Sequence, residues 1–225
     1  MDPSPKAIAR ASRFPFVIHA MLRGSVGFGI VSLAAFSVWA VAGKWFQARF
    51  GKAGLFCACA LVFLGLSGPL LHRLVLGSGS LLRFYEIFLL AFVAYVVVWC
   101  AAWFILHFGL GEWLGSLLGT AAFVAVTGWS FRNYRGSLKA ILILFGLHSA
   151  GYFLGGRLMY WLAGPTGSAM LVGVSRHGVS VLAKLAWGLL YGLGFGAGIG
   201  YAFHIFQHER NQPVPAKPKQ RIIDG

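Results

Sequence analysis

Long apolar stretches constrain this chain more than any other feature of its sequence. About six of them approach or exceed the roughly 20 residues that an α-helix needs to cross a bilayer. They cover residues 25–43, 55–74, 81–107, 113–131, 138–158 and 181–206. Because the hydrocarbon core offers no water to the backbone, a spanning segment must satisfy its own peptide groups, as a helix does. The sequence therefore predicts an all-α fold, a polytopic helical membrane bundle with about six transmembrane helices.

The composition excludes an ordinary soluble domain. Hydrophobic residues make up 58% of the chain and charged residues only 11%, whereas a soluble domain has roughly 25% charged residues. A soluble fold of this length would leave large apolar patches exposed. The net charge of +14 favours contact with the bilayer and its anionic lipid headgroups. We do not expect nucleic acid as a partner, because the basic residues lie at the ends of the apolar stretches.

Three regions follow from this pattern. Residues 1–23 are basic and mixed, with helical spacing of the basic side chains, which favours a short interfacial helix over a disordered arm. Residues 24–208 form the predicted six-helix transmembrane domain. Residues 209–225 are a polar, basic, cytoplasmic tail whose three prolines forbid a helix. A cleaved signal peptide is an alternative for the first stretch, because Ala40-Val-Ala42 fits a cleavage site.

The distribution of Lys and Arg predicts the orientation. With the N-terminus inside, most of the 19 basic residues fall on the cytoplasmic side, as the positive-inside rule requires. We therefore expect a protein that is integral to a membrane, the bacterial inner (plasma) membrane, with both termini cytoplasmic. The loop that carries Lys44, Arg49 and Lys52 argues against this orientation, because it would lie outside.

A possible repeat precedes the three stretches that would enter the membrane from the cytoplasm. Each is preceded by a Gly-Ser pair, namely Gly24-Ser25, Gly79-Ser80 and Gly136-Ser137. Their spacing matches a two-helix hairpin, so the pattern predicts three related hairpins, as in transporters built from repeats. The alternative is that Gly and Ser are common at helix starts in a chain with 31 glycines.

Glycines recur every four residues in two of the predicted helices. They are Gly188, Gly192, Gly196 and Gly200 in the last stretch and Gly111, Gly115 and Gly119 in the fourth. A second stripe in the last stretch contains Gly194 and Gly198. Such stripes let two helix backbones approach closely, so they predict helix-helix interfaces. A partner helix in the same chain is favoured over one in a second copy, although a homo-oligomer or a larger membrane complex is a possible assembly.

Four ionisable residues are candidates for a transport pathway or a ligand site. His148 lies near the predicted membrane midplane, where an ionisable side chain is costly and indicates function, although a structural hydrogen bond also explains it. Glu86 can pair with Arg83 one turn earlier or line a path for a cation or proton. Lys184 is expected to extend its ammonium group to the outer surface.

The remaining histidines are weak candidates for a metal site. His204 and His208 are one turn apart, and His72 falls on the same side of the membrane. Two such histidines could share a metal, but the carboxylates that usually accompany one are scarce. We therefore predict neither a metal nor a cofactor. The chain also lacks a P-loop, a dinucleotide fingerprint and HExxH, which disfavours an enzyme.

Two short segments bear on an enzymatic alternative. Gly65-Leu-Ser67-Gly68, together with the segment from His148 to Gly155, resembles the serine and histidine signatures of rhomboid proteases. The resemblance implies a Ser67–His148 dyad that hydrolyses peptides within the membrane. This sequence departs from that family, because two predicted helices separate the serine and histidine helices, against one there, and the other polar signatures are missing.

Two functions are favoured about equally. The first is a small solute or ion transporter or channel, with the buried ionisable residues along its pathway. The second is a non-catalytic membrane subunit or assembly factor that holds partners through its glycine-striped helices and its tail. An intramembrane Ser/His hydrolase is a remote third.

Overall fold

The computed structural model describes residues 14–75, 81–107 and 109–208, and within them the chain is helical apart from short connections. The helices are α2 (Phe14–Val75), α3 (Leu81–Leu106), α4 (Leu110–Phe131), α5 (Ser137–Ala163), the short α6 (Pro165–Met170) and α7 (Arg176–His208). All except α6 are long and apolar enough to cross a membrane. The predicted all-helical fold is confirmed for the described residues.

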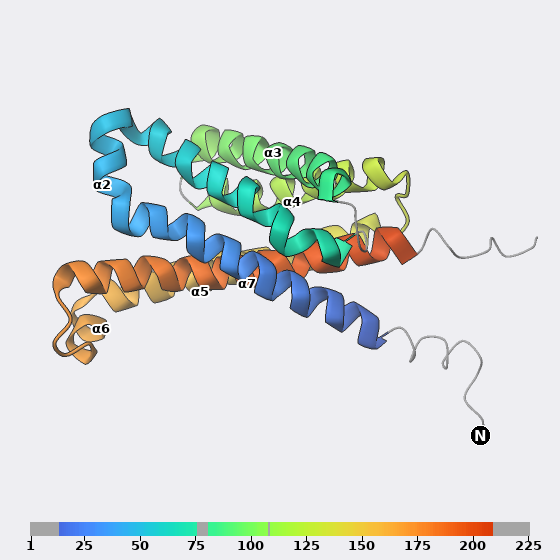
Figure 1. The fold of residues 1–225 in the computed structure, drawn as a ribbon. Helices are drawn as coiled ribbons and strands as arrows, with labels where there is room; N and C mark the ends of the chain where they lie inside the picture. The colour runs from blue at the N-terminus through green and yellow to red at the C-terminus, as the bar shows by residue number, and fades with distance from the viewer. Residues whose placement is uncertain (1–13, 76–80, 108, 209–225) are drawn as a thin grey trace, which may run out of the picture.

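Helix α2 is broken at Gly51 into two arms, residues 14–50 and 52–75, and the chain turns back on itself there (Figure 1). Gly51 has φ 68° and ψ −175°, a backbone conformation that is essentially restricted to glycine. The predicted stretches 25–43 and 55–74 fall on separate arms. The segment expected between them as a loop is helical on both sides of Gly51.

The first arm of α2 packs along α7, and the α7 glycine stripe makes this contact close. A Cβ atom at Gly192 would lie 2.8 Å from the Phe28 carbonyl oxygen, and one at Gly196 would collide with the carbonyl oxygen of Gly24. Ser32 adds a hydrogen bond of 2.6 Å from its hydroxyl to the carbonyl of Gly188. The same stripe continues to Gly200, which faces the backbone of Ala20 and Met21. Small residues therefore bring these two helix backbones into contact.

Two other glycine sets serve different neighbours. On the next face of α7, Gly194 and Gly198 lie against Leu147 and Leu144 of α5. In α4, a Cβ at Gly111 would lie 3.1 Å from the carbonyl oxygen of Ala102, and Gly115 and Gly119 face Trp99 and Tyr95, all on α3. The structure thus places all seven glycines of the two main stripes at contacts within one chain.

Aromatic side chains fill the space between the helices. Fully buried rings come from α2, α3, α4 and α7, and they include Phe28, Phe84, Phe88, Phe123, Phe195 and Phe203. Phe28 packs edge-on to Phe195 with ring centroids 5.3 Å apart, and Phe84 stacks on Phe88 at 5.1 Å. Offset and edge-to-face pairs of this kind stabilise a core beyond simple burial.

The positions of the helix ends can be compared with the three Gly-Ser pairs and with the predicted terminal regions. Residues 14–23 are the first turns of α2, which continues through Gly24-Ser25, so this pair lies inside a helix. Gly136, with φ 76°, precedes α5, and Ser137 begins it. The pair Gly79-Ser80 and the regions 1–13 and 209–225 lie outside the described residues. The three-hairpin repeat stays a prediction.

Candidate functional site

His148 lies in the centre of the bundle and is fully buried. Its ring is enclosed by Tyr95 of α3, Tyr152 of α5, and Tyr191 and Phe195 of α7, with ring centroids 5.2–6.1 Å away. The Tyr152 ring is one turn along the same helix and nearly parallel to the imidazole, at an interplanar angle of 9°. Four helices of the bundle therefore supply or border this site, because Tyr95 itself packs against Gly119 of α4.

One of the two imidazole nitrogens of His148 has a hydrogen-bond partner. A bond of 2.7 Å joins Nε2 to the hydroxyl of Tyr95, whereas Nδ1 is buried and unpaired within the described residues. If Tyr95 donates to Nε2, then Nδ1 carries the proton and lacks an acceptor. If Nε2 donates to Tyr95, then Nδ1 is an acceptor to which no described group donates a hydrogen bond. Either arrangement leaves a buried polar atom unsatisfied, which costs about 1–3 kcal/mol.

The other three candidate pathway residues do not join His148. Glu86 and Arg83 are both exposed on α3, and the face that carries them is not the buried one. Lys184 is half-buried on α7, with its Nζ 4.8 Å from the centre of the Trp39 ring. This contact is a cation–π interaction, and it places Lys184 beside the pocket described below.

The weak metal candidates do not form a described metal centre. The Nδ1–H of His72 donates to the carbonyl of Gly68 at 2.8 Å, while His204 is half-buried near the end of α7, where the side chain of His208 is outside the described part. Where the structure describes the chain, no three His, Cys, Asp or Glu side chains come together as a metal site requires.

The Ser67–His148 dyad implied by the rhomboid resemblance is not formed. The Ser67 hydroxyl donates to the carbonyl of Phe63 at 2.5 Å, within its own helix. His148 uses Nε2 for Tyr95, and its Nδ1 has no partner among the described residues. A dyad requires the serine hydroxyl to lie within hydrogen-bond reach of the histidine. Each group is instead committed elsewhere or unpaired, so the sequence-based dyad is wrong.

A pocket of about 410 Å³ lies between the two arms of α2 and α7, a size within the range of small-molecule sites. Its walls are mainly apolar, and aromatic rings contribute much of them. The lining residues are Ala35, Phe36, Trp39 and Gln47 from the first arm, Lys52, Leu55, Phe56, Cys59 and Phe63 from the second, and Trp187 from α7. The pocket exists because the bend at Gly51 holds two α2 surfaces opposite each other.

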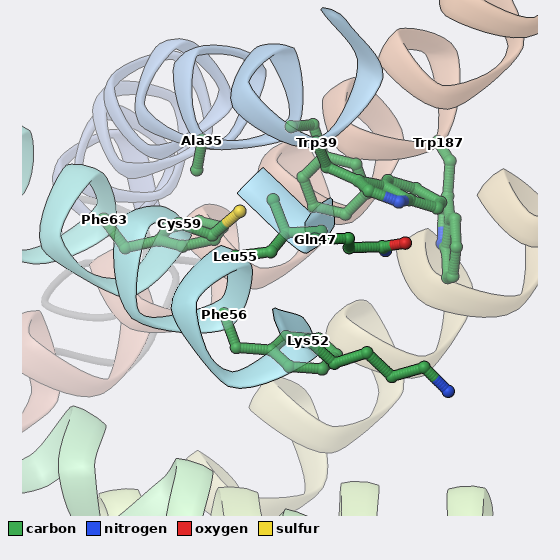
Figure 2. A pocket seen from close by; sticks show the side chains of 10 residues that line it. Ala35, Trp39, Gln47, Lys52, Leu55, Phe56, Cys59, Phe63 and Trp187 are labelled. Carbon is green, nitrogen blue, oxygen red and sulfur yellow. The ribbon is translucent and has the colours of Figure 1, made fainter. Parts of the chain in front are cut away.

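The polar groups of the pocket extend to one side of it, where the rings of Trp39 and Trp187 also lie (Figure 2). Ala35 and Phe63 lie on one side, and the amide of Gln47 and the ammonium of Lys52 extend toward the other. Gln47 and Lys52 are exposed, whereas Ala35 is fully buried. This polarity matches a molecule with an apolar body and a polar end.

Tryptophan and phenylalanine rings hold one wall of the pocket together. Phe36, Trp39 and Trp187 pack on one another in edge-to-face pairs, with centroids 5.7–5.8 Å apart. Trp187 also donates from its indole Nε1 to the carbonyl of Tyr152, at 3.1 Å. These contacts connect the wall to α7 and α5, and the ammonium of Lys184 lies over the Trp39 ring.

Of the basic side chains near the bend, Lys52 lines the pocket and Lys184 contacts Trp39 of its wall. Lys44 and Arg49 precede the bend, Lys52 follows it, and all three are exposed. Together with Lys184, they make this end of α2 and α7 positively charged. The basic segment that opposed the positive-inside orientation therefore contributes Gln47 and Lys52 to the pocket.

Comparisons with protein-family models, curated proteins and solved structures give no match for this chain.

The sequence placed His148 and Lys184 among the candidate residues but did not predict the pocket. The available signal was the cluster of Lys44, Trp45, Gln47, Arg49 and Lys52 around Gly51, which combines charge with aromatic residues.

Proposed function

We propose that this integral membrane protein binds a single-chain anionic amphiphile in the pocket between the two arms of α2 and Trp187. The observation that carries the proposal is the polarity of this pocket, with apolar walls in the bundle and Lys52 and Gln47 at its polar side. Within the transporter hypothesis, the solute is then an amphiphile that enters from the bilayer.

Two physical terms bear on this ligand class, and the second one selects it. Burial of an acyl chain against aromatic and aliphatic walls is favourable by roughly 25 cal/mol per Å² relative to water. A lipid tail already resides in hydrocarbon, so selection must come from the polar end. Lys52 and the nearby Lys184 favour an anionic headgroup over a zwitterionic or neutral one.

We also propose that the chain crosses the membrane six times, with both termini on the same side. Each arm of α2 is long enough to cross the hydrocarbon core, and the ends of the described chain at Phe14 and His208 lie at one end of the bundle, opposite the bend (Figure 1). The pocket rim then faces the side opposite to the termini. In a variant without native cysteines, an impermeant maleimide should label Ala53→Cys from that side only.

Binding is tested by native mass spectrometry of the detergent-purified protein with two probes of equal chain length. We expect lyso-phosphatidylglycerol, an anion, to bind at lower concentration than lyso-phosphatidylcholine, a zwitterion. Cys59→Phe should abolish binding because Cys59 lines the pocket. Cys57→Phe is the matched control, since Cys57 is exposed on the same arm.

A charge variant distinguishes the contribution of the ligand's headgroup from that of its acyl chain. Lys52→Gln should remove the preference for the anion while keeping binding of both probes, and Lys44→Gln should leave the preference unchanged, because Lys44 is exposed and does not line the pocket. Equal binding of both probes to the unaltered protein, or binding that survives Cys59→Phe, would rule out this site.

The non-catalytic subunit or assembly factor and the homo-oligomer stay predictions. They rest on the glycine stripes and on the tail of residues 209–225, which lies outside the described residues. The stripes are used within the chain, so this hypothesis now depends on other surfaces.

A further inference from the structure

A group of buried polar atoms on α3, α4 and α5 is separate from the pocket. The indole Nε1 of Trp99, the hydroxyls of Ser116 and Ser149, and Nδ1 of His148 are buried, and the described residues offer none of them a hydrogen bond. Buried hydroxyls elsewhere in the bundle are satisfied by backbone carbonyls, as in Ser32, Ser67, Thr120 and Thr127. Unpaired buried polar groups are rare in native proteins, so several near one site require an explanation.

Tyr152 contacts two of the residues that carry these atoms. Its ring is stacked on His148 at 6.1 Å and lies 6.0 Å from the ring of Trp99. The Trp99 ring in turn packs on α4, where a Cβ at Gly115, the neighbour of Ser116, would lie 3.2 Å from it. Trp99 and His148 therefore meet at Tyr152, and Ser116 and Ser149 directly follow Gly115 in α4 and His148 in α5.

A carboxylate links this region to the end of the bundle. The hydroxyl of Tyr152 donates to Oε1 of Glu112 at 3.5 Å, and Glu112 lies in the first turn of α4 and is half-buried. The start of α4 is at the same end of the bundle as the bend in α2 (Figure 1). Glu112 is thus a point at which this polar region meets the surface.

We propose that the space from Glu112 to His148 is a hydrated proton-access path. Water molecules bound by Trp99, Ser116 and Ser149 connect the Glu112 carboxylate to Nδ1 of His148. An internal water typically makes about three hydrogen bonds to otherwise unsatisfied polar groups, which is the role that these atoms are placed to fill.

The proton transfer along this path is reversible and involves no other reactant. In the tautomer whose Nε2 carries the proton, Nδ1 takes a proton from the adjoining water and the ring becomes an imidazolium. The hydroxide left behind takes a proton from the Glu112 carboxyl, which is protonated again from outside, and the reverse steps return the proton. The groups that face His148 are Tyr95 from α3, Tyr152 on its own helix, Tyr191 from α7 and, through Tyr152, Glu112 from α4. The path ends at the His148–Tyr95 pair, so the proposal concerns proton access and not conduction across the membrane.

Water-edited solid-state NMR of the isotope-labelled protein in lipid tests the path. We expect magnetisation from water to reach the ring nitrogens of His148 at mixing times that also label the exposed His177, and before it reaches the buried ring of Phe195. Failure of water magnetisation to reach His148 would overturn the proposal.

Variants test the route and the bound water separately. Glu112→Gln should slow hydrogen–deuterium exchange at the His148 ring by at least about a hundredfold, the lower end of the range for a positioned acid–base group, and Glu86→Gln should not change it. Unchanged exchange in Glu112→Gln contradicts the route. Ser116→Ala should lower the melting temperature if the hydroxyl binds water, and a higher melting temperature contradicts hydration, because removal of a dry unpaired hydroxyl is favourable.

Discussion

The bend in α2 should depend on the backbone conformation of Gly51 and not on contacts that a side chain would make there. Gly51 has φ 68° and ψ −175°, and a Cβ placed there would meet no atom within 4 Å. Gly51→Ala therefore adds strain without adding a clash. A residue other than glycine held in such a region costs about 1–3 kcal/mol, and the variant should be destabilised by that amount.

Gly65→Ala is the matched control for this prediction. Gly65 lies in the second arm of the same helix, and a Cβ there also meets nothing within 4 Å, but its backbone is helical. Alanine is favoured over glycine in a helix interior by roughly 0.8–1.0 kcal/mol. The two glycine-to-alanine changes should thus have effects of opposite sign on the free energy of unfolding.

Thermal unfolding in detergent, followed by circular dichroism, measures both variants. For a chain of this size, 1 kcal/mol corresponds to about 2–4 °C in melting temperature. We expect Gly51→Ala to melt about 2–12 °C below the unaltered protein and Gly65→Ala to melt about 2–4 °C above it.

A second measurement shows whether the bend itself is lost. Cys59 and a cysteine introduced at Ala35 both line the pocket from opposite arms, so a short bifunctional maleimide should crosslink them, and Gly51→Ala should reduce the yield. If Gly51→Ala melts like the Gly65→Ala control and crosslinks fully, the positive φ at Gly51 does not define the bend and our reasoning is wrong.

Three further changes test contacts between helices. Gly196→Val should destabilise the α2–α7 pair by about 1–3 kcal/mol through overpacking, because its Cβ meets the backbone of α2; chemical unfolding would measure this. Tyr95→Phe removes the 2.7 Å bond to His148 and should cost about 1–2 kcal/mol, with a change in the His148 nitrogen shifts. Asn133→Ala breaks a 3.0 Å bond to the carbonyl of Phe206 and should speed proteolysis at the α4–α5 connection, whereas unchanged proteolysis would contradict a tethering role.

The existence and approximate bounds of the helices could be predicted from the sequence. The stretch 81–107 corresponds to α3, which ends at Leu106, and the stretch 113–131 corresponds to α4, which begins at Leu110. Agreement is close because a helix in a membrane satisfies its backbone locally. The short α6 was missed, since six residues carry no apolar period.

The candidate site could be predicted only in part. His148 was identified because an ionisable residue in an apolar run is conspicuous, but its partner Tyr95 is 53 residues away and has no distinguishing sequence context. The Ser67–His148 dyad failed for the same reason, because the sequence does not show which helices are neighbours.

The sequence by itself determined apolar, glycine-striped helices long enough to span a membrane, because hydropathy and four-residue spacing are properties of single segments. Only the tertiary structure decided that the stripe of α7 faces α2, that Gly51 is the one described glycine at which α2 is broken, and that the bend leaves a pocket lined by Lys52. The physical reason is that each of these depends on two segments far apart in the chain. Their contact is set by the packing of the whole bundle and not by either segment alone.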